Sequence, residues 1–139
     1  MKKLFALFLV VFTLSACSSS DDGNNSSNSQ ITPPNWIQGT WYINSDIAMT
    51  GYRFTHDDIC QLVGGGAISN CMKENINIYH GTQIVTKVDQ QISDTEYKCV
   101  ITIGPQVLDF HFRKISPNSI KDVNASKTSH VGDIIYIKQ

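Results

Sequence analysis

Residues 96–115, EYKCVITIGPQVLDFHFRKI, decide the fold class of this chain. In 96–103 every second residue, beginning with Tyr97, is apolar, and the alternation returns in 107–115 after the turn pair Gly104-Pro105. A period of two in segments rich in β-branched and aromatic residues is typical of half-buried strands. This stretch therefore predicts two successive β-strands separated by a short turn.

The same pattern continues on both sides of this stretch, with turn residues about every ten positions. Further strands are expected at residues 40–44, 52–55, 59–63, 75–79, 84–92, 119–123 and 134–137. No window shows a sustained apolar stripe with the helical period, so no helix is predicted. Eight or nine antiparallel strands can form an up-and-down barrel or a two-sheet sandwich. We favour a small barrel of about eight strands, because closure removes exposed strand edges and the links are short.

The N-terminus has the features of an export signal. Lys2 and Lys3 precede a mainly apolar run at 4–14, which is shorter than the ~20 residues of a membrane-spanning helix. The following Leu-Ser-Ala-Cys, which ends at Cys17, resembles the lipobox of bacterial lipoproteins. That resemblance implies cleavage after residue 16 and acylation of Cys17, giving a membrane anchor with no further cofactor. The alternative is an ordinary cleaved signal with a chance cysteine.

A polar segment separates this signal from the strands. Residues 18–34 are rich in serine, asparagine and aspartate, and Ile31 is their only apolar residue, so we predict a disordered tether. The predicted organisation is a signal peptide at 1–16, the lipidated cysteine and tether at 17–34, and a β domain at 35–139. Ser18 stands where an aspartate would resemble an inner-membrane retention signal, which favours the outer membrane. The Ser-Ser-Ser-Asp-Asp run at 18–22 resembles a cell-surface export tether; the alternative is a plain spacer on the periplasmic face.

Charge limits the classes of partner. Removal of the signal peptide leaves 9 of the 11 basic side chains against 12 acidic ones, so the formal net charge falls from −1 to −3. No basic run or stripe exists in the sequence. This argues against nucleic acid or anionic lipid as the partner.

Three cysteines remain beyond the lipobox, in a compartment that permits disulfides. Cys60 and Cys71 enclose the glycine turn at 64–66 and are candidates for a disulfide at the base of a hairpin. Two buried free thiols are the alternative for this pair. Cys99 shares the apolar face of its strand and is expected to be a small core residue.

The start of the β domain resembles that of lipocalins and lipocalin-like lipoproteins. Gly39-Thr40-Trp41 matches their Gly-x-Trp motif on the first strand, and residues 110–116 look like a late strand of small bacterial lipocalin-like domains. The resemblance implies that Trp41 closes one end of the barrel, a structural role shared with Gly39. The chain is shorter than an ordinary lipocalin and shows no helix after the barrel, which argues against a deep ligand cavity.

One spacing is compatible with a metal site. His56, Asp58 and Cys60 would share one face of a continuous strand, and such side chains can bind zinc. Residues 56–58 are better interpreted as a tight turn, and no second ligand pair accompanies them. No metal site is therefore predicted.

A second group is compatible with acid–base chemistry. Asp109, His111 and Arg113 share one strand face, opposite the apolar residues of the same strand. The simpler interpretation is the solvated face of an amphipathic strand. The glycines at 64–66 lack the lysine and hydroxyl residue of a phosphate-binding loop, and no Gly-x-Ser-x-Gly elbow exists. No catalytic residue is predicted, and the chain is not expected to be an enzyme.

Three functional hypotheses follow. The first is a noncatalytic, lipid-anchored lipoprotein at the outer membrane that binds a small apolar ligand. The second is a protein-interaction module, such as an envelope inhibitor or an immunity protein against a secreted toxin; a scaffold without a specific ligand is a third possibility. The fold class cannot choose among them. An internal apolar cavity would favour a ligand, and a filled barrel with an exposed apolar patch would favour a protein partner.

Overall fold

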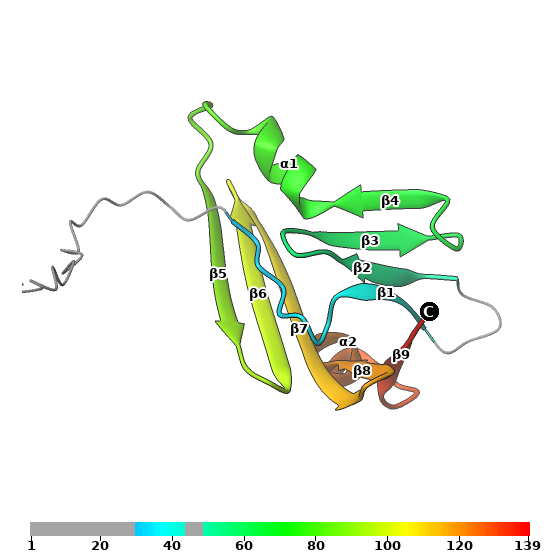
Figure 1. The fold of residues 1–139 in the computed structure, drawn as a ribbon. Coiled ribbons are helices and arrows are strands. Elements are labelled where there is room, and N and C mark those ends of the chain that lie inside the picture. Colours follow the sequence, from blue (N-terminus) through cyan, green and yellow to red (C-terminus); the bar gives the residue numbers. More distant parts are fainter. Residues whose placement is uncertain (1–29, 44–48) are drawn as a thin grey trace, which may run out of the picture.

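The computed structural model describes residues 30–43 and 49–139, which form nine strands and two helices (Figure 1). The lipobox, Cys17 and the tether up to residue 29 lie outside the described residues. The elements are β1 (Gly39–Ile43), β2 (Gly51–Phe54), β3 (Ile59–Val63), β4 (Ile68–Cys71), α1 (Met72–Ile78), β5 (Thr86–Ile92), β6 (Glu96–Ile103), β7 (Gln106–Ser116), β8 (Ser119–Asp122), α2 (Val123–Thr128) and β9 (Ile134–Lys138).

All nine strands belong to one antiparallel sheet with the order β4-β3-β2-β1-β9-β8-β7-β6-β5. The chain runs as a meander, and the first and last strands pair with each other through Trp41–Lys138 and Ile43–Tyr136. The predicted all-β antiparallel class is confirmed, with nine strands in a single sheet rather than the two sheets of a sandwich. The sheet is strongly curled into a half-barrel. Its two ends are β4 and β5, and α1 connects them (Figure 1).

Helix α1 corrects the prediction of a strand at 75–79. Met72 and Ile76 lie four residues apart and are both buried, which is the spacing of one helix face. The alternation of asparagine and isoleucine at 75–78 imitates a strand, and two buried positions give too short a stripe for periodicity to detect. Among the described residues, neither helix is long and apolar enough to cross a membrane.

Helix α2 replaces the predicted end of a strand at 119–123. The strand β8 stops at Asp122, whose side chain accepts a hydrogen bond from the backbone N–H of Ala125 at 2.8 Å. An aspartate in this N-cap position satisfies a donor at the start of a helix. The cap turns the chain out of the sheet before residue 123.

The concave face of the sheet is filled by side chains. Tyr52 lies at the centre, with its ring 4.9 Å from that of Phe112 and 5.2 Å from that of Tyr136, centroid to centroid. These contacts are edge-to-face, an arrangement favoured by the charge distribution of aromatic rings. Phe54 packs in the same way against Phe112. The interior of the curl is therefore a packed core.

The ordered chain begins earlier than predicted. Ile31, assigned by sequence to the disordered tether, is only 2% exposed, and Pro33 is also buried. The Gln90 side chain holds this segment through hydrogen bonds with the backbone of Gln30 and Thr32. Burial of one isoleucine and one proline, together with these hydrogen bonds, offsets the conformational entropy that the segment loses when it becomes ordered. The composition of the segment alone did not predict this contribution. Residues 30–34 therefore belong to the packed domain.

Candidate functional site

Trp41 lies within the hydrophobic core. Its side chain is fully buried, its indole N–H donates to the carbonyl oxygen of Ile37 at 2.6 Å, and the ammonium of Lys138 lies 5.2 Å from the ring centroid. Gly39 has a φ of 125°, a value that side chains rarely allow. The Gly-x-Trp pair thus has structural contacts in this chain and contributes no group to a solvent-accessible site.

Cys60 and Cys71 are directly opposed on β3 and β4, and a disulfide joins them. Cys99 is a buried free thiol, and burial raises its pKa to about 11. A thiol with a raised pKa forms little of the reactive thiolate. The described cysteines therefore serve packing and cross-linking.

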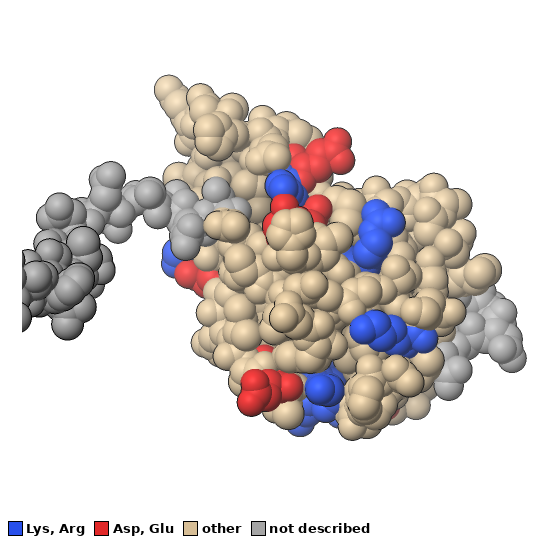
Figure 2. Space-filling view, viewed as in Figure 1, with Lys and Arg blue, Asp and Glu red and all other residues tan. Residues whose placement is uncertain are grey.

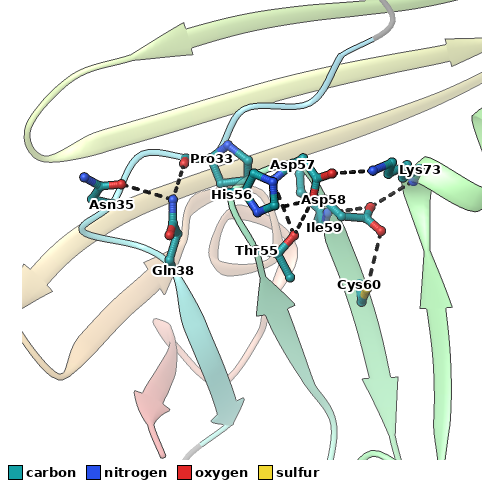
Figure 3. Close-up of polar contacts among 10 residues, drawn as sticks. All are labelled: Pro33, Asn35, Gln38, Thr55, His56, Asp57, Asp58, Ile59, Cys60 and Lys73. Carbon is teal, nitrogen blue, oxygen red and sulfur yellow. Dashed lines mark hydrogen bonds and ion pairs between the residues drawn. The ribbon is translucent and has the colours of Figure 1, made fainter.

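The turn between β2 and β3 holds the start of α1 (Figure 3). One carboxylate oxygen of Asp58 accepts hydrogen bonds from the backbone N–H groups of Ile59 and Lys73, each at 2.8 Å. The Lys73 ammonium pairs with Asp57; this contact lowers the pKa of Asp57 and raises that of Lys73. The turn clamps the helix to the sheet.

The same turn contains His56 and Asp58, which together with Cys60 have a spacing compatible with a metal site. Asp58 lies close to the sulfurs of Cys60 and Cys71, all three ligand atoms being within 4.8 Å of one another. The two sulfurs are bonded to each other and offer no thiolate to a metal. The His56 side chain is 84% exposed and does not belong to this cluster.

Asp109, His111 and Arg113 project from the outer face of β7 and have different partners. Glu96 accepts a hydrogen bond from Arg113 at 2.9 Å and lies 3.0 Å from Nε2 of His111, whereas Asp109 faces Lys98 at 4.0 Å. The hydrogen bond from Arg113, followed by that from His111, lowers the pKa of Glu96. Sequence reasoning missed Glu96, which sits one strand away. The group forms cross-strand ion pairs beside a surface depression of about 330 Å³.

A different hollow lies on the open side of the curl, between the β3–β4 hairpin, α1 and the β6–β7 turn. Its volume is about 340 Å³. Four amide side chains line it together with one tyrosine and three aliphatic residues: Gln61, Asn70, Asn75, Gln106, Tyr79, Ile78, Ile103 and Leu108. No charged side chain is among them. We call this the amide hollow.

The polar groups of the amide hollow connect to the core beneath it. Asn75 donates to the side-chain oxygen of Asn70 at 2.8 Å, and Gln61 lies directly opposite Tyr52 on the neighbouring strand. The Tyr52 hydroxyl in turn interacts with Tyr136 and Asp122. Burial is the main cause that raises the pKa values of Tyr52 and Asp122. A polar cluster of Tyr52, Tyr136 and Asp122 thus adjoins Gln61, outside the residues that line the hollow.

Sequence reasoning did not single out the amides of this hollow. They come from β3, β4, α1 and β7, and asparagine and glutamine are common on any polar strand face. The only available signal was the pair Asn70 and Asn75 flanking Cys71. A smaller hollow of about 260 Å³ lies beside residues 30–31 and α1, lined in part by Asp57, Lys73 and Asn77.

Comparison of this chain with protein-family models, with curated proteins and with solved structures finds no match. The assignment of a function therefore rests on the sequence and on the geometry described above.

Proposed function

We propose that this chain is a noncatalytic, lipid-anchored binding protein of the outer membrane, exposed at the cell surface, and that its lipocalin-like domain takes a small uncharged ligand in the amide hollow. The observation that supports this proposal is the composition of that hollow, in which amides and aliphatic side chains line about 340 Å³ without a charged group. Binding sites for small molecules have volumes of about 300–1,000 Å³, a range that includes this hollow; most such sites have mainly apolar walls, whereas polar side chains make up most of the lining here.

The chemistry of the walls indicates the class of ligand. Each amide side chain offers both donors and an acceptor, so it can match hydroxyl or amide groups on a ligand. Ile78, Ile103 and Leu108 offer apolar contact, and Tyr79 adds an aromatic ring. A neutral molecule with an apolar part and several hydrogen-bonding groups fits these walls better than a purely apolar one. Because aromatic side chains fill the core, the ligand would sit at the opening.

The noncatalytic assignment follows from the same walls. The residues lining the amide hollow include no serine, cysteine, histidine, lysine or carboxylate, and Tyr79 is the one side chain among them of a type that serves as a nucleophile or general base. The location follows from the lipobox at Cys17 and from Ser18 after it. These sequence features support an outer-membrane anchor.

A pair of variants on one helix tests the ligand proposal. Asn75 and Asn77 both lie on α1, but only Asn75 lines the amide hollow, whereas Asn77 lines the smaller hollow. Native mass spectrometry of protein purified from envelopes identifies the bound small molecule, and titration of that molecule then measures affinity. Asn75→Leu is expected to weaken binding at least tenfold and Asn77→Leu to leave it unchanged. The reverse result, or no small molecule retained by the wild type, overturns the proposal.

One observation favours a protein partner as the second candidate function. Met49, Val63 and Ile68 are exposed apolar residues gathered at the tip of the β3–β4 hairpin, where the Gly65 N–H donates to the Met49 carbonyl at 2.8 Å. Exposed apolar groups of this kind mark protein-interaction sites. Affinity capture with the wild type and with Val63→Ser/Ile68→Ser tests it, because a specific partner would be lost only from the variant.

A further inference from the structure

We infer that the uncharged end of the domain around the β6–β7 turn docks on the surface of the lipid bilayer that holds the anchor. This inference rests on the lipid anchor of the proposed function and adds an orientation to it. Four exposed aliphatic side chains form this surface, which we call the apolar tip: Ile78, Ile84, Val85 and Val107.

Several contacts gather these residues at one end of the molecule. The N–H of Gly104 in the β6–β7 turn donates to the carbonyl of Val85 at 2.9 Å, which places the start of β5 against that turn. Val107 follows the turn on β7. Ile78, at the end of α1, lines the amide hollow with Leu108, on the opposite face of β7 from Val107, so the tip is the rim at which the two faces of the sheet meet. The four side chains are 43–69% exposed, so the protein itself leaves them in water.

The apolar tip itself contains no lysine, arginine or carboxylate; the exposed His80 lies within it, and Glu74 and Lys87 border it. Residues 75–86, which include the end of α1 and the connection to β5, contain no lysine, arginine, aspartate or glutamate, and neither do residues 102–108. In Figure 2 the upper projection of the molecule is mostly tan, with a carboxylate group directly beside it and the other charged side chains below. Transfer of a charged group into the interfacial region is costly, whereas aliphatic groups gain by it. Without basic residues, the tip suits a neutral lipid surface rather than an anionic one.

The described chain begins close to this end. Gln30 lines the same small hollow as Asn77, the residue before Ile78. Residues 18–29 separate Gln30 from Cys17, a connection of 12 residues. Such a connection spans at most about 40 Å when extended and about 20 Å as a random coil. The anchor therefore keeps the whole domain within reach of the bilayer, and weak apolar contact of the tip suffices because the encounter is intramolecular. Since Ile78 also lines the amide hollow, docking would hold that hollow beside the bilayer.

Two labelled positions on one strand test the docking. Val107 and Ile115 lie near opposite ends of β7 and are similarly exposed, at 61% and 55%. V107C and I115C are each labelled with an environment-sensitive fluorophore in the lipidated full chain, in which Cys17 is acylated and Cys99 is buried. The proteins are reconstituted in phosphatidylcholine vesicles. We expect iodide quenching of the label at 107 to be several-fold weaker than at 115, with quenching by spin-labelled lipid only at 107.

Other outcomes distinguish failure of the lipid anchor from failure of the docking. Lipidated protein that fails to float with the vesicles overturns the anchor itself. Protein that floats but shows equal iodide access at both positions overturns the docking alone. Protection of position 107 in the absence of vesicles assigns the tip to a second copy or a protein partner and also overturns the docking. In the V107C background, Ile84→Ser/Val85→Ser is expected to restore iodide access at 107 to the level of 115.

Discussion

The indole N–H of Trp41 donates a hydrogen bond to the backbone carbonyl of Ile37 at 2.6 Å, and both side chains are fully buried. This bond ties the turn that precedes β1 to the core of the sheet. It joins a residue of the Gly-x-Trp motif to the segment through which the chain enters the domain.

We expect Trp41→Ala to destabilise the domain by ~3–5 kcal/mol, because truncation of a buried tryptophan leaves a cavity and removes this hydrogen bond. Trp41→Phe should cost less, since most of the buried area is kept. Trp36→Ala is the control, because Trp36 is only partly buried. Urea denaturation measures all three, and an unfolding midpoint for Trp41→Ala equal to that of the wild type would contradict the expectation.

The disulfide between Cys60 and Cys71 closes a loop of 11 residues. In the chain-entropy model a loop of this size contributes ~3 kcal/mol, so Cys60→Ser/Cys71→Ser should lower the free energy of unfolding by that order. Cys99→Ala serves as the matched single-cysteine control. Non-reducing peptide mapping of protein purified from envelopes checks the pairing. If Cys60 and Cys71 both alkylate without reductant after unfolding, the bridge is absent.

Asp58 is predicted to stabilise the start of α1 specifically. Asp58→Ala removes the acceptor of the Lys73 N–H, so amide hydrogens of α1 should exchange several-fold faster, while those of β6 stay protected. His56→Ala, in the same turn but exposed, should leave both unchanged. Equal exchange in α1 of the two variants would show that Asp58 does not hold the helix.

The carboxyl group of Asp122 makes the free energy of unfolding depend on pH, and the direction of its pKa shift fixes the sign of that dependence. Burial raises its pKa above the ordinary 3.8, so the folded protein keeps this proton to a higher pH than the unfolded chain does. The contribution of Asp122 to the free energy of unfolding therefore falls as the pH rises from 3.8 through the raised pKa, and is constant above it. Asp122→Asn keeps an acceptor for the Ala125 N–H and removes this dependence.

Denaturation curves at successive pH values test this by the difference in free energy of unfolding between the wild type and Asp122→Asn. We expect that difference to fall over the stated window. Asp133→Asn, which changes an exposed carboxylate near the start of β9, is the control. A flat difference for Asp122→Asn, or the same fall for Asp133→Asn, would disprove the assignment.

Cys17 lies outside the described residues and is tested in cells. Cys17→Ser should abolish labelling with palmitate and leave the precursor uncleaved, because the thiol is the expected acylation site. Cys99→Ala should be labelled like the wild type. Palmitate incorporation into the Cys17→Ser protein would refute the lipobox interpretation.

Strand content could be predicted from local pattern. The strands expected at 59–63 and 96–103 coincide with β3 and β6. In β6 the alternation over eight residues records which face is buried, whereas β3 does not alternate and is predicted from its β-branched residues between two turns. The short helix α1 could not be predicted, because its two buried positions give a pattern too short to separate helix from strand. The burial of Ile31 could not be predicted for a related reason, since a single apolar residue in a polar segment shows no periodicity.

By itself the sequence determined that the domain is built of antiparallel strands and that the chain carries one more acidic than basic side chain, and it led us to expect a lipobox at Cys17. These properties depend on neighbouring residues or on totals, which sequence contains directly. Only the tertiary structure decided that β1 pairs with β9, that the sheet ends at β4 and β5, and that four amides from β3, β4, α1 and β7 line one hollow. Such contacts join residues as much as 97 positions apart, from Trp41 to Lys138, and they depend on the curl of the whole sheet. Local alternation is the same whichever strands become neighbours.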